Sequence, residues 1–185
     1  MYYQIINVGK ESIGIVWQYK GSKPQIERIF LPCVKAELLA KIKKEFPEVI
    51  KKEQKIPYRI ATQITEFYSG KRIKFDLSLL NLKKLSGFSA KVLKYNCKIP
   101  YGKVATYSGL AAAVGSPRAA RAVGTALANN PFPLIIPCHR VVRADRTLGG
   151  FGGGIKMKKG LLLREGIIID KKGCVDVKCL NLNRD

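Results

Sequence analysis

Apolar and polar residues alternate along two stretches near the start of the chain, residues 13–19 and 25–31, with glycine, serine and proline between them. Alternation of period two on either side of a turn predicts a β-hairpin. Apolar residues then recur at helical spacing over residues 35–44 and 58–69, which predicts two amphipathic helices. Residues 71–85 are expected to form another strand and a linker. The first part of the chain is therefore predicted to be mixed α and β.

From Ser86 onward the pattern changes to short helices. Apolar spacing predicts a helix over residues 88–96, and an alanine-rich stretch predicts two more, roughly 108–114 and 117–128. The dipeptide Ser116-Pro117 separates the last two, because serine is a preferred N-cap and proline suits the first position of a helix. Two short helices joined by a tight turn form a helix-turn-helix pattern.

The second helix of this pattern is predicted to have two different faces. At 100° per residue, Ala120, Val123 and Leu127 fall on one side and form a packing face. The opposite side combines two cations with very small side chains: Arg118, Arg121, Ala122 and Thr125. Such a surface allows a helix to enter a DNA groove while its arginines bind phosphates or replace bases. A bundle helix with exposed arginines fits the same pattern equally well.

Charge favours the first of these two interpretations. The 185 residues contain 34 lysines and arginines against 13 aspartates and glutamates, a net charge of +21. This balance disfavours a polycationic substrate and favours nucleic acid or an anionic membrane surface. No apolar run approaches the ~18–20 residues that a membrane span needs, so we expect no membrane partner. With 46% hydrophobic residues the chain can form a core, and its length fits one domain or two small ones.

The most distinctive segment, residues 129–142, carries three prolines and a cysteine that is followed by a histidine. Each proline lacks an N–H, so the segment cannot form a regular ladder and presents Cys138 at a defined angle. A thiol attacks as the thiolate, and its free pKa is ~8.5, so a neighbouring base or cation must assist near neutral pH. His139 is the only histidine, and a bridging water is needed if the adjacent side chains diverge. Glu165 is the nearest downstream acid in an apolar context and a candidate to orient the imidazole.

A buried structural thiol is the alternative interpretation of Cys138, and it is the one we give to Cys33, Cys97, Cys174 and Cys179. The five cysteines form no CxxC pair, and four-ligand zinc spacing is absent. We therefore expect a reduced, cytoplasmic protein, nucleoid-associated if prokaryotic. The N-terminus lacks a basic segment followed by a long apolar one, so no signal peptide is expected.

The run Ile136-Pro137-Cys138-His139-Arg140-Val141 resembles the acceptor-cysteine signature of the O(6)-alkylguanine-DNA alkyltransferases, also called methylated-DNA–protein-cysteine methyltransferases. The resemblance extends from about residue 88 to residue 166 and includes residues 99–104, residues 118–124 and Asn130-Pro131. The N-terminal half is similar only in length and in its mixed α/β character.

This resemblance implies an α+β fold with two domains. Residues 1–85 would form a small mixed α/β, ribonuclease-H-like N-terminal domain. Residues 86–185 would form a mostly helical C-terminal domain that contains the helix-turn-helix, binds DNA and accepts the alkyl group.

The resemblance also implies direct reversal of DNA damage. The damaged guanine is flipped out of the duplex, and its O6-alkyl group passes by in-line displacement to the sulfur of Cys138. The thioether is permanent, so each molecule acts once. The implied partner is double-stranded DNA that contains O6-alkylguanine, and it is bound by a monomer that uses no cofactor.

The functional residues of the family carry over position by position. Cys138 takes the place of the acceptor, His139 that of a water-mediated base, and Glu165 that of the group that orients this base. Asn130 would help to position the cysteine loop. Tyr107 falls where a tyrosine contacts the phosphate and donates to guanine N3.

Arg121 falls where an arginine enters the base stack in place of the flipped base, and it shares a DNA-facing side with Arg118, Ala122 and Thr125. The backbone carbonyls of Cys138 and Val141 would recognise the guanine amino group. The residues implied to line the substrate pocket are Leu127, Val141, Phe151 and Gly152.

The chain departs from the family pattern at two places. The family pocket often has Tyr-Ser where this chain has Phe151-Gly152, so a backbone N–H at Gly152, rather than a hydroxyl, is expected to reach O6. Some relatives bind a structural zinc through N-terminal cysteine and histidine residues. Because Cys33 is the only cysteine before Cys97 and that half has no histidine, we expect no metal.

Two other classes of protein remain as alternatives. A non-enzymatic damage sensor of this fold would bind lesions and recruit other factors, but it does not require Cys138 beside His139. A basic helix-turn-helix regulator generally needs a dimer and base-reading side chains. The alanines of the second helix, Ala119, Ala120 and Ala122, carry no hydrogen-bonding groups with which to read bases.

Overall fold

A computed structural model of the protein describes residues 1–49, 53–85 and 87–180. Ser86, where the second domain is predicted to begin, and residues 181–185, where it ends, lie outside the described residues. Contacts divide the chain into two compact units. Unit 1 comprises Met1–Ser69, Ile73–Leu82 and Pro131–Ile135, and unit 2 comprises Gly70–Arg72, Lys83–Asn130 and Ile136–Asp185. The boundary at residue 85 stays a prediction.

Unit 1 contains a three-stranded antiparallel sheet in the order β1 (Tyr2–Val8), β2 (Glu11–Lys20) and β3 (Lys23–Cys33). The predicted hairpin is confirmed as β2 and β3, which pair through Ile15 and Ile29. The alternation argument did not predict β1, whose residues do not alternate strictly. The segment 131–135 belongs to this unit, since the Pro131 carbonyl accepts a 2.9 Å hydrogen bond from the backbone N–H of Ile29 on β3.

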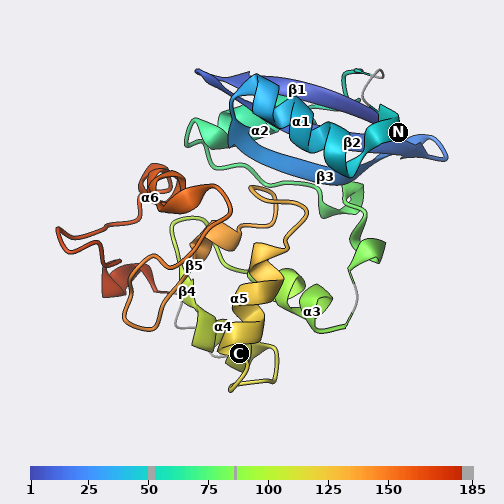
Figure 1. The fold of residues 1–185 in the computed structure, drawn as a ribbon. Coiled ribbons are helices and arrows are strands. Elements are labelled where there is room, and N and C mark those ends of the chain that lie inside the picture. Colours follow the sequence, from blue (N-terminus) through green and yellow to red (C-terminus); the bar gives the residue numbers. More distant parts are fainter. Residues whose placement is uncertain (50–52, 86, 181–185) are drawn as a thin grey trace. The chain divides into compact units, whose positions relative to one another are not determined.

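Two helices pack on this sheet where the apolar spacing predicts them, α1 (Lys35–Glu45) and α2 (Ile60–Tyr68). In Figure 1, α1 crosses one face of the sheet. Gly14 permits this close approach, because a Cβ there would lie 2.9 Å from Cδ1 of Leu38. A short 3-10 turn, η1 (Pro47–Val49), follows α1.

The strand predicted within residues 71–85 is wrong. The structure has two 3-10 turns instead, η2 (Leu77–Leu79) and η3 (Leu82–Lys84). Only Leu80 forms a bridge, with Ile26 of β3, and the Asn81 N–H donates to the Ile26 carbonyl at 2.9 Å. Alternation does not suffice for a strand, because the ladder also needs a partner whose hydrogen bonds are available along its length.

Unit 2 is mostly helical. Its helices are α3 (Gly87–Asn96), α4 (Tyr107–Ala113), α5 (Ala120–Ala128) and α6 (Gly154–Arg164), and its short parallel strands are β4 (Ala105–Thr106) and β5 (Val141–Val142). The helices predicted over residues 88–96 and 108–114 are confirmed as α3 and α4. Thr106 caps α4, because its hydroxyl accepts from the Gly109 N–H at 2.9 Å. Within the described part of the chain, no helix is long and apolar enough to cross a bilayer.

The start predicted for the next helix is wrong by one turn. Helix α5 begins at Ala120 rather than at Pro117, and its N-cap residue, Ala119, makes no side-chain capping bond. The Ser116 carbonyl accepts from the Ala119 N–H at 2.9 Å, so Ser116 closes a tight turn instead of capping a helix. Arg118 consequently lies in the turn before α5 and not on its face.

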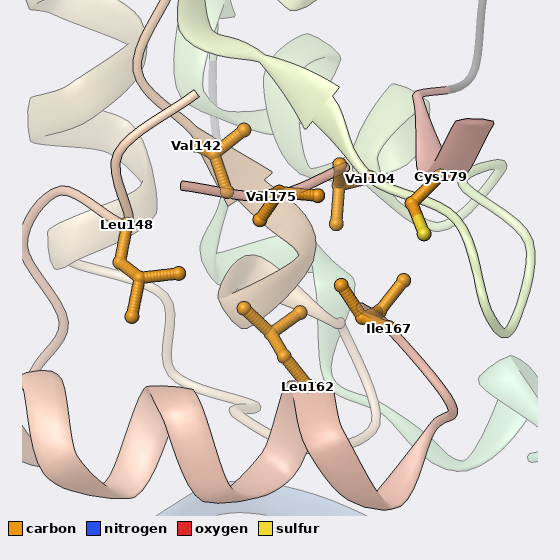
Figure 2. Packing of buried hydrophobic residues seen from close by; sticks show 7 residues of the cluster. All are labelled: Val104, Val142, Leu148, Leu162, Ile167, Val175 and Cys179. Atoms are coloured by element: carbon orange, nitrogen blue, oxygen red, sulfur yellow. The ribbon is translucent and has the colours of Figure 1, made fainter. Parts of the chain in front are cut away.

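The segment after α6 packs into the core of unit 2. Figure 2 shows the cluster to which it contributes: Val104, Val142, Leu148, Leu162, Ile167, Val175 and Cys179. The Val104 N–H donates to the Cys179 carbonyl at 2.8 Å, within a final 3-10 turn, η5 (Val177–Cys179). The cluster holds α6 and β5 together, and β5 directly follows the segment that contains Cys138.

We predict that Leu162→Ala lowers the free energy of unfolding by about 2–5 kcal/mol, because it opens a cavity in this cluster. Leu162 is fully buried, whereas its neighbour Leu163 is 49% exposed. Leu163→Ala is therefore the matched control, with an expected change within about 0.5 kcal/mol. Urea unfolding of both variants measures the difference, and equal losses would contradict the packing described here.

Candidate active site

Cys138 begins a single 3-10 turn, η4 (Cys138–Arg140), at the end of the proline-containing segment. Residues 131–137 lie outside every helix and strand of the structure, as the three prolines predict. Two buried asparagines hold the backbone just before the cysteine. Asn130 Nδ2 donates to the Ile136 carbonyl at 2.9 Å, and Asn96 Nδ2 donates to the Pro137 carbonyl at 3.2 Å. The path that leads to Cys138 is therefore fixed from both α3 and the end of α5.

Asn96 was not predicted from the sequence. It is the last residue of α3, and its side chain is fully buried. The available signal was a polar residue at helical spacing from Val92 and Leu93, which are themselves buried. Buried amides need partners, but the partner carbonyl comes from a distant segment that the spacing does not reveal.

Cys138 is buried, with 9% of the residue exposed. Burial raises its pKa, while a hydrogen bond from Asn130 and the positive charge of Lys158 lower it, and the net shift is upward. The resting group is therefore a neutral thiol at neutral pH. It requires a base to take its proton before it can attack.

His139, Arg140 and Glu165 form one buried cluster. His139 Nε2 lies 2.7 Å from Oε1 of Glu165, Arg140 Nε donates to Oε2 at 2.7 Å, and a second guanidinium N–H donates to Oε1 at 3.0 Å. Arg140 also donates to the Ile99 carbonyl at 2.8 Å. The pairing of Glu165 with His139 is the contact that the sequence analysis proposed, and Arg140 is a partner of the same carboxylate that it missed.

The two titratable partners differ in resting charge: His139 is neutral and Glu165 is an anion. Burial lowers the pKa of His139 despite the hydrogen bond to Glu165. Burial alone would raise the pKa of Glu165, but the hydrogen bonds from His139 and Arg140 hold it below its usual range. A carboxylate only accepts, so Nε2 carries the proton and Nδ1 is the basic nitrogen of the neutral ring. The cluster presents a neutral imidazole in a defined tautomer.

Lys158 is a second residue that sequence reasoning missed. Its side chain is fully buried on α6, and Nζ donates to the Val141 carbonyl at 2.6 Å and to the Gly150 carbonyl at 3.3 Å. Burial lowers its pKa to about 8. The signal was helical spacing, since Lys158, Leu162 and Glu165 fall on one face of α6.

A hollow of about 360 Å³ lies beside α5. Its lining residues are Tyr107, Ser108, Ala120, Arg121, Gly124, Arg143, Ala144 and Gly150. Two of the residues expected to contact DNA, Tyr107 and Arg121, thus come together. Arg118, Ala122 and Thr125 are exposed but are not among the lining residues. Arg143 is a lining cation that the sequence analysis did not name.

The residues expected to line the substrate pocket lie in three places. Leu127 lies on the buried side of α5 together with Val123. Val141 is buried in β5, directly after η4. The ring of Phe151 is 6.5 Å from that of His139 in an edge-to-face arrangement, and Gly152 is exposed in the loop before α6.

The described residues contain no cluster of metal-binding side chains. Among them, no three His, Cys, Asp or Glu side chains lie close enough together to hold an ion. Cys97 is mostly buried, and burial raises its pKa to about 11. Its environment suits a packing residue rather than a nucleophile.

Comparisons with known proteins identify relatives of this chain. Residues 87–167 match the family model described as the DNA-binding domain of 6-O-methylguanine DNA methyltransferase. The methylated-DNA–protein-cysteine methyltransferase of Methanothermobacter thermautotrophicus is 44% identical over 113 residues, which are 60% of this chain and 62% of that protein. The protein of the same name from Methanosarcina barkeri is 36% identical over 165 residues, or 89% of this chain and 97% of that protein.

A solved structure agrees with the sequence matches. Mycobacterium tuberculosis OGT, crystallised in complex with DNA, superposes with a TM-score of 0.64 at 27% identity, covering 89% of this chain and 92% of that one. The α+β class and the family resemblance are thereby confirmed. Since the Methanosarcina relative is matched over nearly its whole length, the chain belongs to the family of methylated-DNA–protein-cysteine methyltransferases.

Proposed function

We propose that this protein reverses alkylation damage in duplex DNA by transferring the O6-alkyl group of guanine irreversibly to the sulfur of Cys138. The observation that carries the proposal is the buried contact of His139 with Glu165, directly beside a thiol that needs a base. Family membership supports the reaction class, and the related M. tuberculosis OGT was crystallised in complex with DNA. No cofactor enters the scheme.

The transfer begins with the proton of the Cys138 thiol. Neutral His139 accepts it at Nδ1 through a bridging water, and Glu165 stabilises the imidazolium that results. The thiolate then attacks the alkyl carbon in line, so that the carbon–sulfur bond forms as the carbon–oxygen bond breaks. The electron pair of the broken bond stays on the guanine, which leaves with a negative charge on O6. The thioether has no route back, so each molecule acts once.

The leaving guanine needs hydrogen-bond donors. Burial raises the pKa of Tyr107, and the charge of Cys138 raises it further, so its hydroxyl keeps the proton that it would donate to guanine N3. In the structure this hydroxyl donates to the Gly150 carbonyl over 3.5 Å, a long bond that substrate can replace. The backbone N–H of Gly152 would serve O6. Donors placed where charge develops lower the barrier.

Duplex DNA would be bound through α4 and α5 as a helix-turn-helix. The two helices pack against each other, and α5 exposes Arg121 beside the small side chains of Ala122 and Thr125. Unit 2 holds 21 of the 34 lysines and arginines but only five of the 13 acidic residues, a charge suited to phosphates. Arg121, at the hollow, would replace the flipped base.

The finer fold assignments belong to the same proposal. Residues 1–85 would form the ribonuclease-H-like domain and residues 86–185 the domain that binds DNA and accepts the alkyl group. The protein would act as a monomer in the cytoplasm or on the nucleoid.

Stoichiometric transfer without turnover is the first prediction of this proposal. One equivalent of methyl group should leave O(6)-methylguanine duplex in a burst, after which the reaction stops, because the thioether is not hydrolysed. Mass spectrometry should find one added methylene on Cys138, and Cys138→Ser should abolish the burst. Cys97→Ser is the matched control and should react normally. Sustained turnover would disprove the single-use mechanism.

A pH profile tests the base. Burial lowers the pKa of His139, so the transfer rate should stay constant from neutral pH down to ~6.5, the ordinary histidine value. The rate should fall only below that pH, where the protonated ring no longer accepts. His139→Gln should slow transfer by a factor on the order of 10²–10⁴ and remove this step from the profile. DNA binding should hardly change, because the imidazole is buried. An unchanged rate in His139→Gln would assign the proton to another acceptor.

The two arginines near α5 should behave differently. Arg121→Ala should lose about 1–3 kcal/mol of stacking and repair duplex poorly, while its reaction with free O(6)-benzylguanine, which needs no flipping, changes little. Arg118→Ala should lower the salt slope of binding by roughly one unit on all sequences. Single-turnover rates on both substrates measure the difference. If both variants behave alike, Arg121 does not replace the flipped base.

A further inference from the structure

The chain continues beyond α6 and beyond the residues that match the family model, which end at residue 167. No step of the proposed transfer uses the segment that follows, residues 168–180. This segment folds back on itself, because Ile169 and Val175 form an antiparallel bridge. Val175 is fully buried in the cluster of Figure 2, so the returning part of the segment is anchored in the core of unit 2.

The same segment holds the turn that follows β5. Two hydrogen bonds of 2.9 Å close this turn, one from the Arg146 N–H to the Arg143 carbonyl and one from the Arg143 N–H to the Thr147 carbonyl. Val175 contacts Arg146 at two places. Its N–H donates to the Arg146 carbonyl at 3.0 Å, and its carbonyl accepts from the Arg146 guanidinium at 3.4 Å. The turn is therefore tied to the buried part of the segment.

Arg146 has a backbone conformation that arginine does not favour. Its φ is +68°, in the left-handed region where the Cβ of an L-residue crowds the following carbonyl oxygen. A hairpin turn with these two hydrogen bonds normally has glycine at the left-handed position. A strained conformation persists only where surrounding contacts enforce it, and the two bonds to Val175 are such contacts.

The strained turn borders the hollow that is expected to receive DNA. Arg143, its first residue, lines this hollow together with Arg121 and Tyr107. The side chain of Arg143 is exposed, so its charge is available to a phosphate. Because Arg143 and Arg146 share a backbone hydrogen bond, the conformation of Arg146 helps to set the position of Arg143.

The segment also holds the second strand that leads to the hollow. The Val104 N–H donates to the Cys179 carbonyl at 2.8 Å, and Lys103 Nζ donates to the Lys178 carbonyl at 2.8 Å. Val104 directly precedes β4, and Tyr107 directly follows it. The segment therefore contacts the chain beside both β4 and β5, each of which leads to residues that line the hollow.

We propose that residues 168–180 form a clamp for duplex binding, which holds Arg146 in its left-handed conformation and thereby keeps Arg143 placed to bind a backbone phosphate. The proposal rests on the proposed function only in taking duplex DNA as the ligand of the hollow. Arg146 is a positioning residue, because its guanidinium already donates to the Val175 carbonyl. A partly populated binding conformation weakens affinity in proportion, so release of the clamp should weaken duplex binding.

The test compares two substitutions of Arg146 by their Kd for undamaged duplex, measured by fluorescence anisotropy. Arg146→Ala and Arg146→Gly remove the same charge and the same bond to Val175, but only glycine adopts a positive φ freely. Arg146→Ala should weaken duplex binding about fivefold, because alanine disfavours the left-handed conformation. Arg146→Gly should stay within about twofold of the unaltered protein. Both variants should react with free O(6)-benzylguanine at the unaltered rate.

The other outcomes of this comparison overturn the proposal. Equal losses in the two variants would make Arg146 a direct phosphate contact, and unchanged Kd values in both would show that its conformation has no effect on binding. A slower reaction of Arg146→Ala with the free base would place the effect in the active site. Failure of the proposed function is distinguishable, because a protein that transfers no alkyl group still gives the duplex Kd values.

A double-mutant cycle tests whether Arg146 acts through Arg143. Arg143→Ala should weaken duplex binding and lower its salt slope by about one unit. Addition of Arg146→Ala to this variant should cause no further loss, because the effects of residues that act through one contact are not additive. Additive losses would overturn the proposal.

A substitution in the clamp itself completes the test. Val175→Ala removes buried packing and should weaken duplex binding, whereas Val177→Ala is the matched control, because Val177 lies in the same segment and is 54% exposed. Arg146→Gly should remove the loss caused by Val175→Ala, since glycine does not need the clamp. Thermal unfolding establishes that each variant is folded, and if Val175→Ala is not, the two Arg146 variants decide. A folded Val175→Ala protein with an unchanged duplex Kd would overturn the proposal.

Discussion

The Glu165 carboxylate is the group on which the candidate active site depends. It accepts from His139 at one oxygen and from Arg140 at both, and the Arg140 guanidinium continues to the Ile99 carbonyl. One buried anion therefore joins the end of α6, the turn that contains Cys138 and the segment after α3. Removing either ionic member, Arg140 or Glu165, would leave an uncompensated buried charge, so these two groups depend on each other.

Burial has a different effect on each titratable group of the site. It keeps Cys138 a thiol, His139 a neutral base and Tyr107 a hydroxyl donor. It also lowers the pKa of Lys158 to about 8, which is closer to neutral pH than the ordinary value of a lysine. These shifts have one cause, the desolvation of charged forms, and together they leave each group in the protonation state that the proposed transfer requires at neutral pH.

Secondary structure was predictable where local patterns decide it. The hairpin of β2 and β3, the helices α1 to α4 and the irregular path of residues 131–137 follow from apolar spacing and from prolines. The prediction failed for residues 71–85, where the pairing with β3 is confined to the bridge of Leu80 with Ile26, and at the start of α5, where the Ser116 carbonyl rather than its hydroxyl closes the turn. Both failures depend on hydrogen-bond partners that spacing does not specify.

The residues of the candidate active site likewise fall into two groups, those that the sequence predicts and those that tertiary contacts bring in. The sequence by itself determined the candidate acceptor, base and orienting acid, because a cysteine, the only histidine and a proline-bounded backbone are adjacent in the chain, and Glu165 is the nearest downstream acid in an apolar context. Only the tertiary structure decided which groups surround them. Arg140 pairs with Glu165, Asn96 donates a hydrogen bond to the Pro137 carbonyl, and the buried Lys158 donates to the Val141 carbonyl. These partners are far apart along the chain, and their meeting depends on how helices α3 and α6 pack around the η4 turn, which no local pattern encodes.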